Sequence, residues 1–265
     1  MSNKLEGIPS IYYLNLDSEL DRREFMEKQF EKWNLSNVTR FSGSQYLAEN
    51  YEDWKSILHF PHKITEKKHQ LAASITLSTL EMIRHWLETT NEKHLILFED
   101  DYDLDLIEYW HFDWKYLMNH IPYDWDCIQL GYESSRFIKF FLHPKDETSA
   151  YGPILINRHF AQKLINLHYV KDKYMLIRKY GSYPYSTGHR VVSLDSFICF
   201  LGKTYQLPLI TQNPHLDKVP KKHHFLCRDM YYEWWQNERD NFSLEDFFSY
   251  GKENDYQMTI KVNYQ

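Results

Sequence analysis

The sequence predicts an α/β fold: a single Rossmann-like, mostly parallel sheet flanked by helices, with an aromatic-rich helical extension at the C-terminal end. Three observations support this class. Short apolar runs of strand length alternate with longer segments of helical periodicity. The run at 94–98 is apolar almost throughout, which is typical of a strand buried on both faces. The region from Phe225 to about Phe248 is dense in aromatic residues, including Trp234 and Trp235.

Length and composition indicate a globular protein. A chain of 265 residues, 43% of them hydrophobic, is long enough for one large domain with a substantial core. We expect one domain over residues 1–212 and an extension over 213–265 packed on it. The net charge of −6 and the dispersed Lys and Arg residues argue against a nucleic-acid polymer as partner. Cys127, Cys199 and Cys227 are widely separated and predict reduced, buried thiols.

The N-terminal segment and the hydropathy pattern bear on localisation. Residues 1–7 lack the apolar core of a signal peptide, and no apolar run is long enough for a transmembrane segment. These features predict a soluble, cytoplasmic protein and are compatible with peripheral membrane association. The aromatic C-terminal region is also a candidate homodimer surface.

The N-terminal half predicts a strand, two helices and a second strand. Residues 11–16 form the first expected strand, and residues 18–21 have the form of a capping box that opens a helix to about Trp33. Residues 38–64 show no strong period and predict a loop-rich excursion. Apolar positions between 66 and 87 describe a long amphipathic helix. The apolar run that begins at His94 follows directly.

The second half continues the alternation. Strands are expected at 126–131, 151–156 and 205–210, and a helix at 159–167 with Asn157 as its N-cap. Strand and helix thus alternate as in βαβ units, which predicts a largely parallel sheet.

A cluster of carboxylates at 99–103 ends the apolar run. Acidic residues at the C-terminal end of a buried strand fall where open α/β sheets bind ligands. Crowded carboxylates repel one another unless a cation or a base compensates. Mg²⁺ and Mn²⁺ prefer oxygen ligands and are commonly held by one or two carboxylates together with substrate phosphates. The alternative is a solvated acidic turn without a ligand.

Charged residues stand in unusual places at two further positions. Arg22 and Arg23 fall in the first turns of a predicted helix, where the helix dipole disfavours cations unless an anion is near. Simple surface placement is the alternative. Asp195 lies in the apolar stretch 191–198, where a buried carboxylate requires a partner. A structural salt bridge or a helix cap is the alternative to a functional role.

The order of these features resembles glycosyltransferase family 25, the lipopolysaccharide-type and collagen-galactosyltransferase-like family. The resemblance covers about residues 10–212 and rests on Ile11 to Leu16 followed by Arg22-Arg23, Leu77-Ser78, Leu97-Phe98-Glu99-Asp100-Asp101, Ala150-Tyr151-Gly152 with Ile154, Ala161 and Leu164, Leu194-Asp195-x-Phe197, and Tyr205, Pro208 and Gln212. The segment Ser74 to Thr79 departs from the family's G-C-x-L-S-H pattern, with Ser for Gly and Thr for His. This departure bears on the identity of the donor sugar or on how that sugar is bound.

The resemblance implies a GT-A type fold, a UDP-sugar donor and a divalent cation, Mn²⁺ or Mg²⁺. It implies transfer of a hexose, with retention, to a glycan, a glycoconjugate or another hydroxyl acceptor. Two other functions stay open on the residues alone. One is a metal-dependent phosphodiesterase, and the other is a non-catalytic protein that binds sugar or a partner on the same fold.

The resemblance also implies roles for single residues. Asp101 is the expected metal ligand and Asp103 an alternative one, while Asp195 is the expected catalytic group beside the sugar. A histidine of the 215–224 segment would complete the metal sphere, and the sequence does not say which. The residues expected to bind the nucleotide-sugar and its cofactor are Asn15, Leu16, Arg22, Ser78, Glu99 and Asp100.

Overall fold

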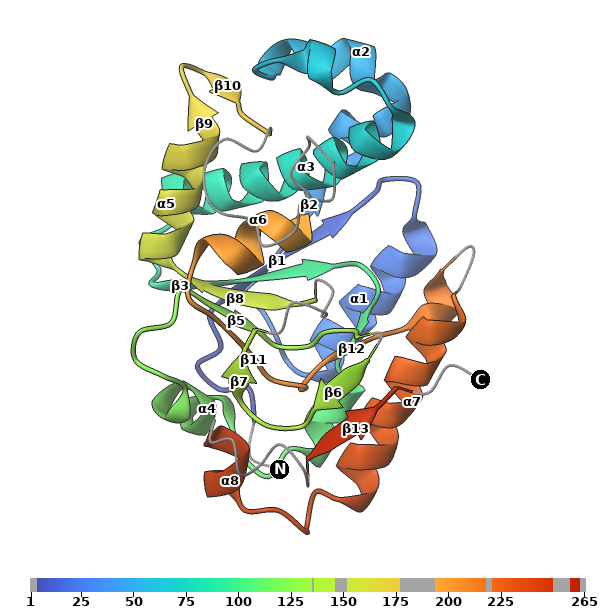
Figure 1. The fold of residues 1–265 in the computed structure, drawn as a ribbon, viewed down its shortest axis with the longest axis vertical. Coiled ribbons are helices and arrows are strands. Elements are labelled where there is room, and N and C mark those ends of the chain that lie inside the picture. The colour runs from blue at the N-terminus through green and yellow to red at the C-terminus, as the bar shows by residue number, and fades with distance from the viewer. Residues whose placement is uncertain are drawn as a thin grey trace.

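A seven-stranded sheet forms the centre of the computed structural model, which describes residues 4–134, 136–145, 152–176, 194–217, 221–249 and 258–262 (Figure 1). In spatial order its strands are β2 (Val38–Ser42), β1 (Ser10–Asn15), β3 (His94–Glu99), β8 (Ile154–Asn157), β5 (Cys127–Gln129), β11 (Thr204–Gln206) and β7 (His143–Pro144). Five of them run in one direction, whereas β8 is antiparallel to both neighbours and β7 to β11. The predicted α/β class with a mostly parallel sheet is therefore confirmed.

Helices cover both faces of this sheet (Figure 1). The helices on one face are α2 (Tyr51–Trp54), α3 (Lys67–Thr89), α5 (Arg158–His168) and α6 (Leu194–Leu201). Those on the other face are α1 (Leu20–Lys32), α4 (Trp114–His120), α7 (Lys222–Asn237) and α8 (Leu244–Phe248). The aromatic-rich C-terminal segment thus forms helices that pack on the sheet, as the sequence predicts.

Strand β3 shows why the apolar run is continuous. Leu95 and Leu97 pack into the cluster that contains α3, whereas Ile96 and Phe98 pack into the cluster that contains α1 and α7. Successive side chains of a strand point to opposite faces, so a strand covered on both sides needs apolar residues at every position. None of these four residues is more than 2% exposed.

Three two-stranded sheets complete the described structure. They pair β4 (Tyr102–Asp103) with β12 (Thr211–Gln212), β6 (Phe137–Lys139) with β13 (Thr259–Lys261), and β9 (Tyr169–Val170) with β10 (Lys173–Tyr174). The first of these sheets brings Gln212 beside residues 100–103, the carboxylate-rich stretch after β3, which we call the acidic segment.

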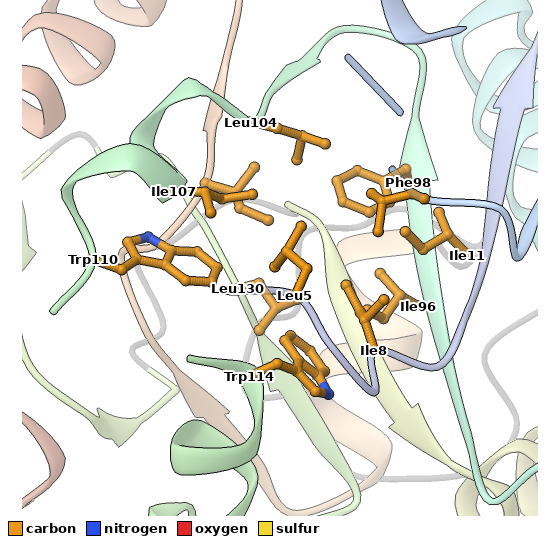
Figure 2. A pocket seen from close by; sticks show the side chains of 12 residues that line it. Leu5, Ile8, Ile11, Ile96, Phe98, Leu104, Ile107, Trp110, Trp114 and Leu130 are labelled. Carbon is orange, nitrogen blue, oxygen red and sulfur yellow. The ribbon is translucent and has the colours of Figure 1, made fainter. Parts of the chain in front are cut away.

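The core on the α1 face is almost filled. Figure 2 shows the apolar side chains that line a cavity in it, among them Leu5, Trp110 and Trp114. The volume of this cavity is only about 10 Å³. A site of that size and polarity has no room for a substrate. It is therefore a packing defect of the core.

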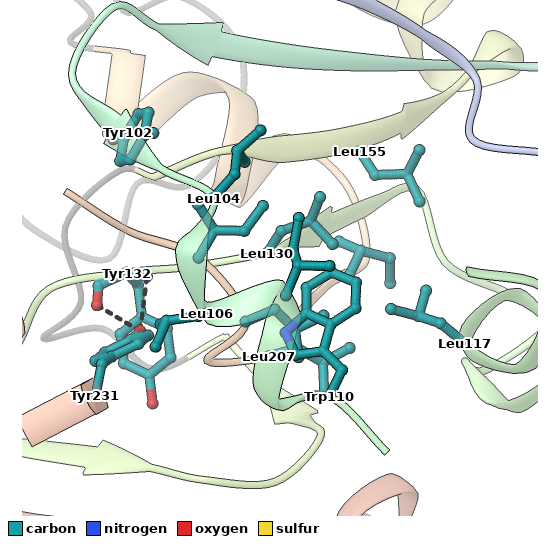
Figure 3. Packing of buried hydrophobic residues seen from close by; sticks show 14 of the residues in the cluster. Tyr102, Leu104, Leu106, Trp110, Leu117, Leu130, Tyr132, Leu155, Leu207 and Tyr231 are labelled. Atoms are coloured by element: carbon teal, nitrogen blue, oxygen red, sulfur yellow. Dashed lines mark hydrogen bonds between the residues drawn. The ribbon is translucent and has the colours of Figure 1, made fainter. Parts of the chain in front are cut away.

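Hydrogen bonds inside this core attach α7 to the segment that follows β5. The Tyr231 hydroxyl donates to the Tyr132 carbonyl over 2.8 Å and accepts from the Tyr132 amide over 3.0 Å, as Figure 3 shows. The Cys227 thiol lies 3.7 Å from the Ser134 carbonyl. The residue between them, Glu133, is therefore held from both sides against α7.

Two expectations about local structure were wrong. The 38–64 region contains strand β2, which the sequence conceals because every residue of this edge strand is only half-buried. The predicted capping box does not form, because α1 begins at Leu20 and its N-cap, Glu19, makes no side-chain capping bond. By contrast, Asn157 caps α5 as predicted, with its Oδ1 accepting from the Phe160 amide over 2.8 Å.

In the part of the chain that the structure describes, no helix combines the length and the apolarity needed to cross a bilayer.

Candidate functional site

A pocket of about 450 Å³ lies where β1 and β3 end. Seven of the nine residues predicted for the site line it: Asn15, Leu16, Arg22, Ser78, Glu99, Asp100 and Asp101. They come from the end of β1, from α1, from α3 and from the segment after β3. The fold therefore gathers at one place residues that are up to 86 positions apart in the chain. We call this space the acidic pocket.

The lining of the acidic pocket combines apolar and acidic side chains. Apolar side chains line part of it, namely those of Leu14, Leu16, Leu47, Leu71 and Ile75. Five carboxyl residues also line it, Glu19, Glu49, Glu99, Asp100 and Asp101, against one cationic residue, Arg22. An apolar wall accepts a flat ring, but this excess of negative charge repels an anion unless a cation is bound with it.

Arg22 connects the acidic segment to the chain that precedes α7. Its Nη1 donates to Asp100 Oδ1 over 2.9 Å, and its Nη2 donates to Asp217 Oδ1 over 3.1 Å. Both Nε and Nη2 also donate to the Leu216 carbonyl. Arg22 is thus a positioning residue in this structure. Its neighbour Arg23 forms an exposed ion pair with Glu27, so the two arginines have different roles.

Asn15 and Asp100 support each other in the lining of the pocket. The Asn15 amide donates to Asp100 Oδ2 over 2.7 Å and to the Glu19 carbonyl over 3.1 Å, while its oxygen accepts from Arg40 Nε over 2.8 Å. Both carboxylate oxygens of Asp100 are thereby engaged by Asn15 and Arg22. This network fixes the backbone that presents the next residue, Asp101.

Asp101 carries an oxygen without a partner. Its Oδ2 accepts from Gln212 Nε2 over 2.7 Å and lies 3.6 Å from Arg22 Nη1. Its Oδ1 is buried and has no hydrogen-bond partner within the described residues. Burial raises the pKa of Asp101 from 3.8 to about 6, and the charges of Asp100 and Asp217 act in the same direction. A buried carboxylate oxygen left without a donor fits a hard divalent cation.

Asp103 has a different environment. One oxygen accepts from Arg228 Nη2 over 3.1 Å and from the Tyr232 hydroxyl over 3.0 Å, and the other accepts from the Asp105 amide over 2.9 Å. These bonds attach the acidic segment to α7. Asp103 does not line the acidic pocket, so the two candidate ligands are separated by the fold.

The remaining predicted positions are Ser78 and Asp195. The Ser78 hydroxyl donates to the Ser74 carbonyl one turn earlier in α3, which leaves its oxygen able to accept a further hydrogen bond. Asp195 falls in the first turn of α6, and its side chain lies outside the described part of the structure. Its expected catalytic role stays a prediction.

A second group of ligand-type side chains consists of Glu133, His223 and His224, which we call the His–Glu cluster. One ligand atom from each lies within 4.8 Å of the others, and no other such group of three occurs among the described residues. Glu133 Oε2 lies 3.4 Å from His224 Nε2 and 3.6 Å from His223 Nε2. Burial, aided by the charges of Asp101 and Asp217, raises the pKa of Glu133 to about 7.

The sequence analysis did not identify Gln212, Asp217 or Glu133 as members of these groups. Glu133 follows β5, which runs parallel to β3, so the argument used for the acidic segment applies to it as well. Gln212 belongs to the segment that carries the family resemblance but was given no role, and Asp217 carries no signal, because both positions depend on how the chain after β11 folds back over the sheet. Of the three candidate histidines, His215 contacts the Phe225 ring and is not in the cluster.

No protein-family model matches the chain, and the search of curated proteins found no significant match. Similar solved structures include A197 from STIV, at 12% identity and TM-score 0.37 over 82% of this chain and 100% of that one. A nucleoside-diphosphate-sugar pyrophosphorylase from Vibrio cholerae RC9 has 11% identity and TM-score 0.35 over 79% of both chains.

HddC from Yersinia pseudotuberculosis, complexed with GMP-PN, has 10% identity and TM-score 0.36 over 84% of this chain and 100% of that one. Because all three TM-scores lie below 0.5, these similarities support no argument about the activity of this chain. The resemblance to glycosyltransferase family 25 stays a prediction.

Proposed function

We propose that this protein is a metal-dependent glycosyltransferase of GT-A type that moves a hexose from a UDP-sugar to a hydroxyl acceptor. The observation that supports this proposal most is the composition of the acidic pocket. It combines an apolar wall, a group of carboxylates and, at Asp101, a buried oxygen without a hydrogen-bond donor among the described residues. A nucleoside diphosphate together with a divalent cation matches all three features.

The proposed donor complex assigns a role to each part of the pocket. The base and ribose lie against the apolar side chains, with Glu99 as an acceptor for a ribose hydroxyl and Ser78 as a further polar group of the lining. Asp101 holds Mn²⁺ or Mg²⁺ through its unpartnered oxygen. Asn15 and Arg22 act through Asp100, which they hold in place beside this ligand.

In sugar transfer, the bound cation and the residues of the protein have separate roles. A bound divalent cation supplies the positive charge that neutralises the diphosphate leaving group. Asp101 would hold that charge in the pocket, Asp100 supports the backbone before it, and the apolar side chains of the lining exclude water from the nucleoside. Asp195 at the start of α6 is the proposed group beside the sugar, where a carboxylate stabilises an oxocarbenium-like state or accepts a proton.

The test is a nucleotide-binding titration with and without the metal. UDP should raise the melting temperature in Mn²⁺ and have little effect in EDTA, because the carboxylates that line the pocket repel a bare diphosphate. Asp101→Asn should abolish the metal-dependent part. Arg23→Ala is the matched control, since Arg23 makes only an exposed ion pair nearby and should leave binding unchanged.

A panel of nucleotide-sugars with Mn²⁺ separates the alternatives. Slow release of UDP from one UDP-sugar, lost in Asp101→Asn, supports the transferase. Cleavage of a simple phosphodiester without release from any nucleotide-sugar would assign a phosphodiesterase instead. Equal UDP binding in Mn²⁺ and EDTA would refute the proposed donor complex.

A further inference from the structure

We propose that Glu133, His223 and His224 form a second metal site, which binds a divalent transition metal such as Zn²⁺ independently of Asp101. Two imidazole nitrogens and one carboxylate oxygen converge there, with all three atoms within 4.8 Å of one another. A His₂Glu ligand set is typical of protein zinc sites that keep a position open for water or substrate. Magnesium, which prefers oxygen ligands, is a poor match for it.

The hydrogen bonds around His224 determine which of its nitrogens faces the cluster. Its Nδ1 lies 3.1 Å from Asp217 Oδ2. A carboxylate can only accept, so Nδ1 carries the proton and donates. In the neutral ring Nε2 then has its lone pair directed at Glu133. A carboxylate that orients a ligand histidine through its other nitrogen is the usual outer-shell arrangement of zinc sites.

If Nε2 of His223 is also unprotonated, two imidazole lone pairs face one carboxylate oxygen, an arrangement that a cation between them would stabilise. Glu133 Oε2 lies 3.4 Å from His224 Nε2 and 3.6 Å from His223 Nε2. The other oxygen, Oε1, is buried without a hydrogen-bond partner among the described residues. A metal ion satisfies these atoms together. The competing arrangement is a protonated imidazole that bridges two carboxylates without a metal.

The cluster is held in place before any ion binds. Tyr231 clamps the backbone of Tyr132, and Cys227 contacts the carbonyl of Ser134, so the chain on each side of Glu133 is attached to α7 (Figure 3). His223 and His224 lie in the first turn of that same helix. Ligands fixed by their surroundings lose little conformational entropy when the metal binds.

Asp217 connects this site to the acidic pocket. Its Oδ2 contacts His224, and its Oδ1 accepts from Arg22, which in turn donates to Asp100. A metal in the His–Glu cluster would therefore fix the segment that braces Arg22. The second site does not rest on the proposed transferase activity, because none of its three ligands lines the pocket.

The experiment is a Zn²⁺ titration of the full chain after treatment with a chelator and dialysis, followed by calorimetry. We expect one Zn²⁺ site whose affinity falls at least about 100-fold in His224→Ala and Glu133→Gln, and about 10 to 100-fold in Asp217→Asn. Mg²⁺ should not compete. His215→Ala is the matched control, because His215 lies outside the cluster and should leave the affinity unchanged.

Co²⁺ provides a readout of the ligands themselves. Visible absorption of the Co²⁺-loaded protein should change in His223→Ala, a half-exposed position where the substitution leaves the fold intact, as circular dichroism would verify. Absence of stoichiometric Zn²⁺ binding would overturn the proposal in favour of the protonated bridge. Zn²⁺ affinity that is lost in Asp101→Asn but kept in His224→Ala would also overturn it. Failure of UDP binding with Zn²⁺ binding intact would count against the transferase only.

Discussion

Replacing Asp101 by Asn should stabilise the metal-free protein at neutral pH. The buried Asp101 carboxylate receives one hydrogen bond, from Gln212, and its second oxygen has no partner in the described structure. Asn keeps the shape and can still accept from Gln212, but it carries no charge. The cost of holding an ionised group in this place therefore disappears.

The size of the effect follows from the pKa. Burial first, and then neighbouring acids, raise the pKa of Asp101 from 3.8 to about 6 in the folded protein. At 1.36 kcal/mol for each pH unit, this difference corresponds to about 3 kcal/mol. Because the folded state holds the proton more tightly, the native protein loses this stability as pH rises from about 4 to about 6. Below that window both states are protonated and the cost is absent.

Urea unfolding in EDTA at pH 4 and pH 7.5 measures the prediction. Asp101→Asn should match the wild type at pH 4 and exceed it by up to about 3 kcal/mol at pH 7.5, or by about 6 to 12 °C in melting temperature. Adding Mn²⁺ should stabilise only the wild type. A variant equal to or less stable than the wild type at pH 7.5 in EDTA would show that the Asp101 carboxylate is satisfied by the protein alone.

Asp103→Asn, the same change two residues later, is a matched control that should lower the free energy of unfolding. Asp103 accepts from Arg228 and Tyr232 and is 3% exposed. Asp103→Asn leaves the Arg228 guanidinium without its charged partner and should cost about 3 kcal/mol at pH 7.5. Stabilisation by both variants would mean that general repulsion among the acids, and not the local environment of Asp101, governs the result.

Other substitutions test the supporting structure. Arg22→Ala should lower the unfolding free energy by about 3 kcal/mol, because it leaves buried carboxylates unpaired, whereas Arg23→Ala should change it by less than about 0.5 kcal/mol; urea unfolding of both would detect the difference. Gly131→Ala should destabilise by about 3 kcal/mol or more, since a methyl group there would lie 1.8 Å from a backbone oxygen, and a well-folded variant with wild-type melting would contradict this contact. Tyr231→Phe should cost about 2 to 3 kcal/mol by removing the two hydrogen bonds that its hydroxyl makes with the backbone of Tyr132, and an unchanged unfolding midpoint would argue against the clamp.

Elements of the fold were predictable where the local sequence pattern agreed with the tertiary environment of the same residues. The apolar run of β3 and the helical periodicity of apolar residues in α3 directly indicate which side chains are buried. Asn157 is an N-cap whose side chain acts within its own turn. Strand β2 escaped prediction because its half-buried edge position removes the apolar alternation. The antiparallel direction of β8 is set by the chain that precedes it, which the apolar pattern of 154–157 cannot report.

The candidate site was predictable to the extent that it depends on strand ends. Residues at the ends of β1 and β3 had to lie together once the two strands were parallel neighbours, and the structure places Asn15 beside Asp100. The partners of Arg22 were not predictable, since Leu216 and Asp217 are nearly 200 residues away in sequence. The different environments of Asp101 and Asp103 also required the position of α7.

Both proposed metal sites lie at the same edge of the central sheet, where the carboxyl ends of its parallel strands meet. Strands β1, β3 and β5 run in the same direction, so the segments that follow them all emerge at that edge. Strand β8 stands between β3 and β5, and Gly152, just before β8, approaches the Gly131 carbonyl so closely that a Cβ would lie only 1.9 Å away. This contact holds the segment leading to Glu133 against the chain that enters β8. The carboxylates that line the acidic pocket outnumber its one cationic residue, Arg22, so protonation or a bound cation is needed to compensate their charge, and the metal titrations proposed above distinguish the two.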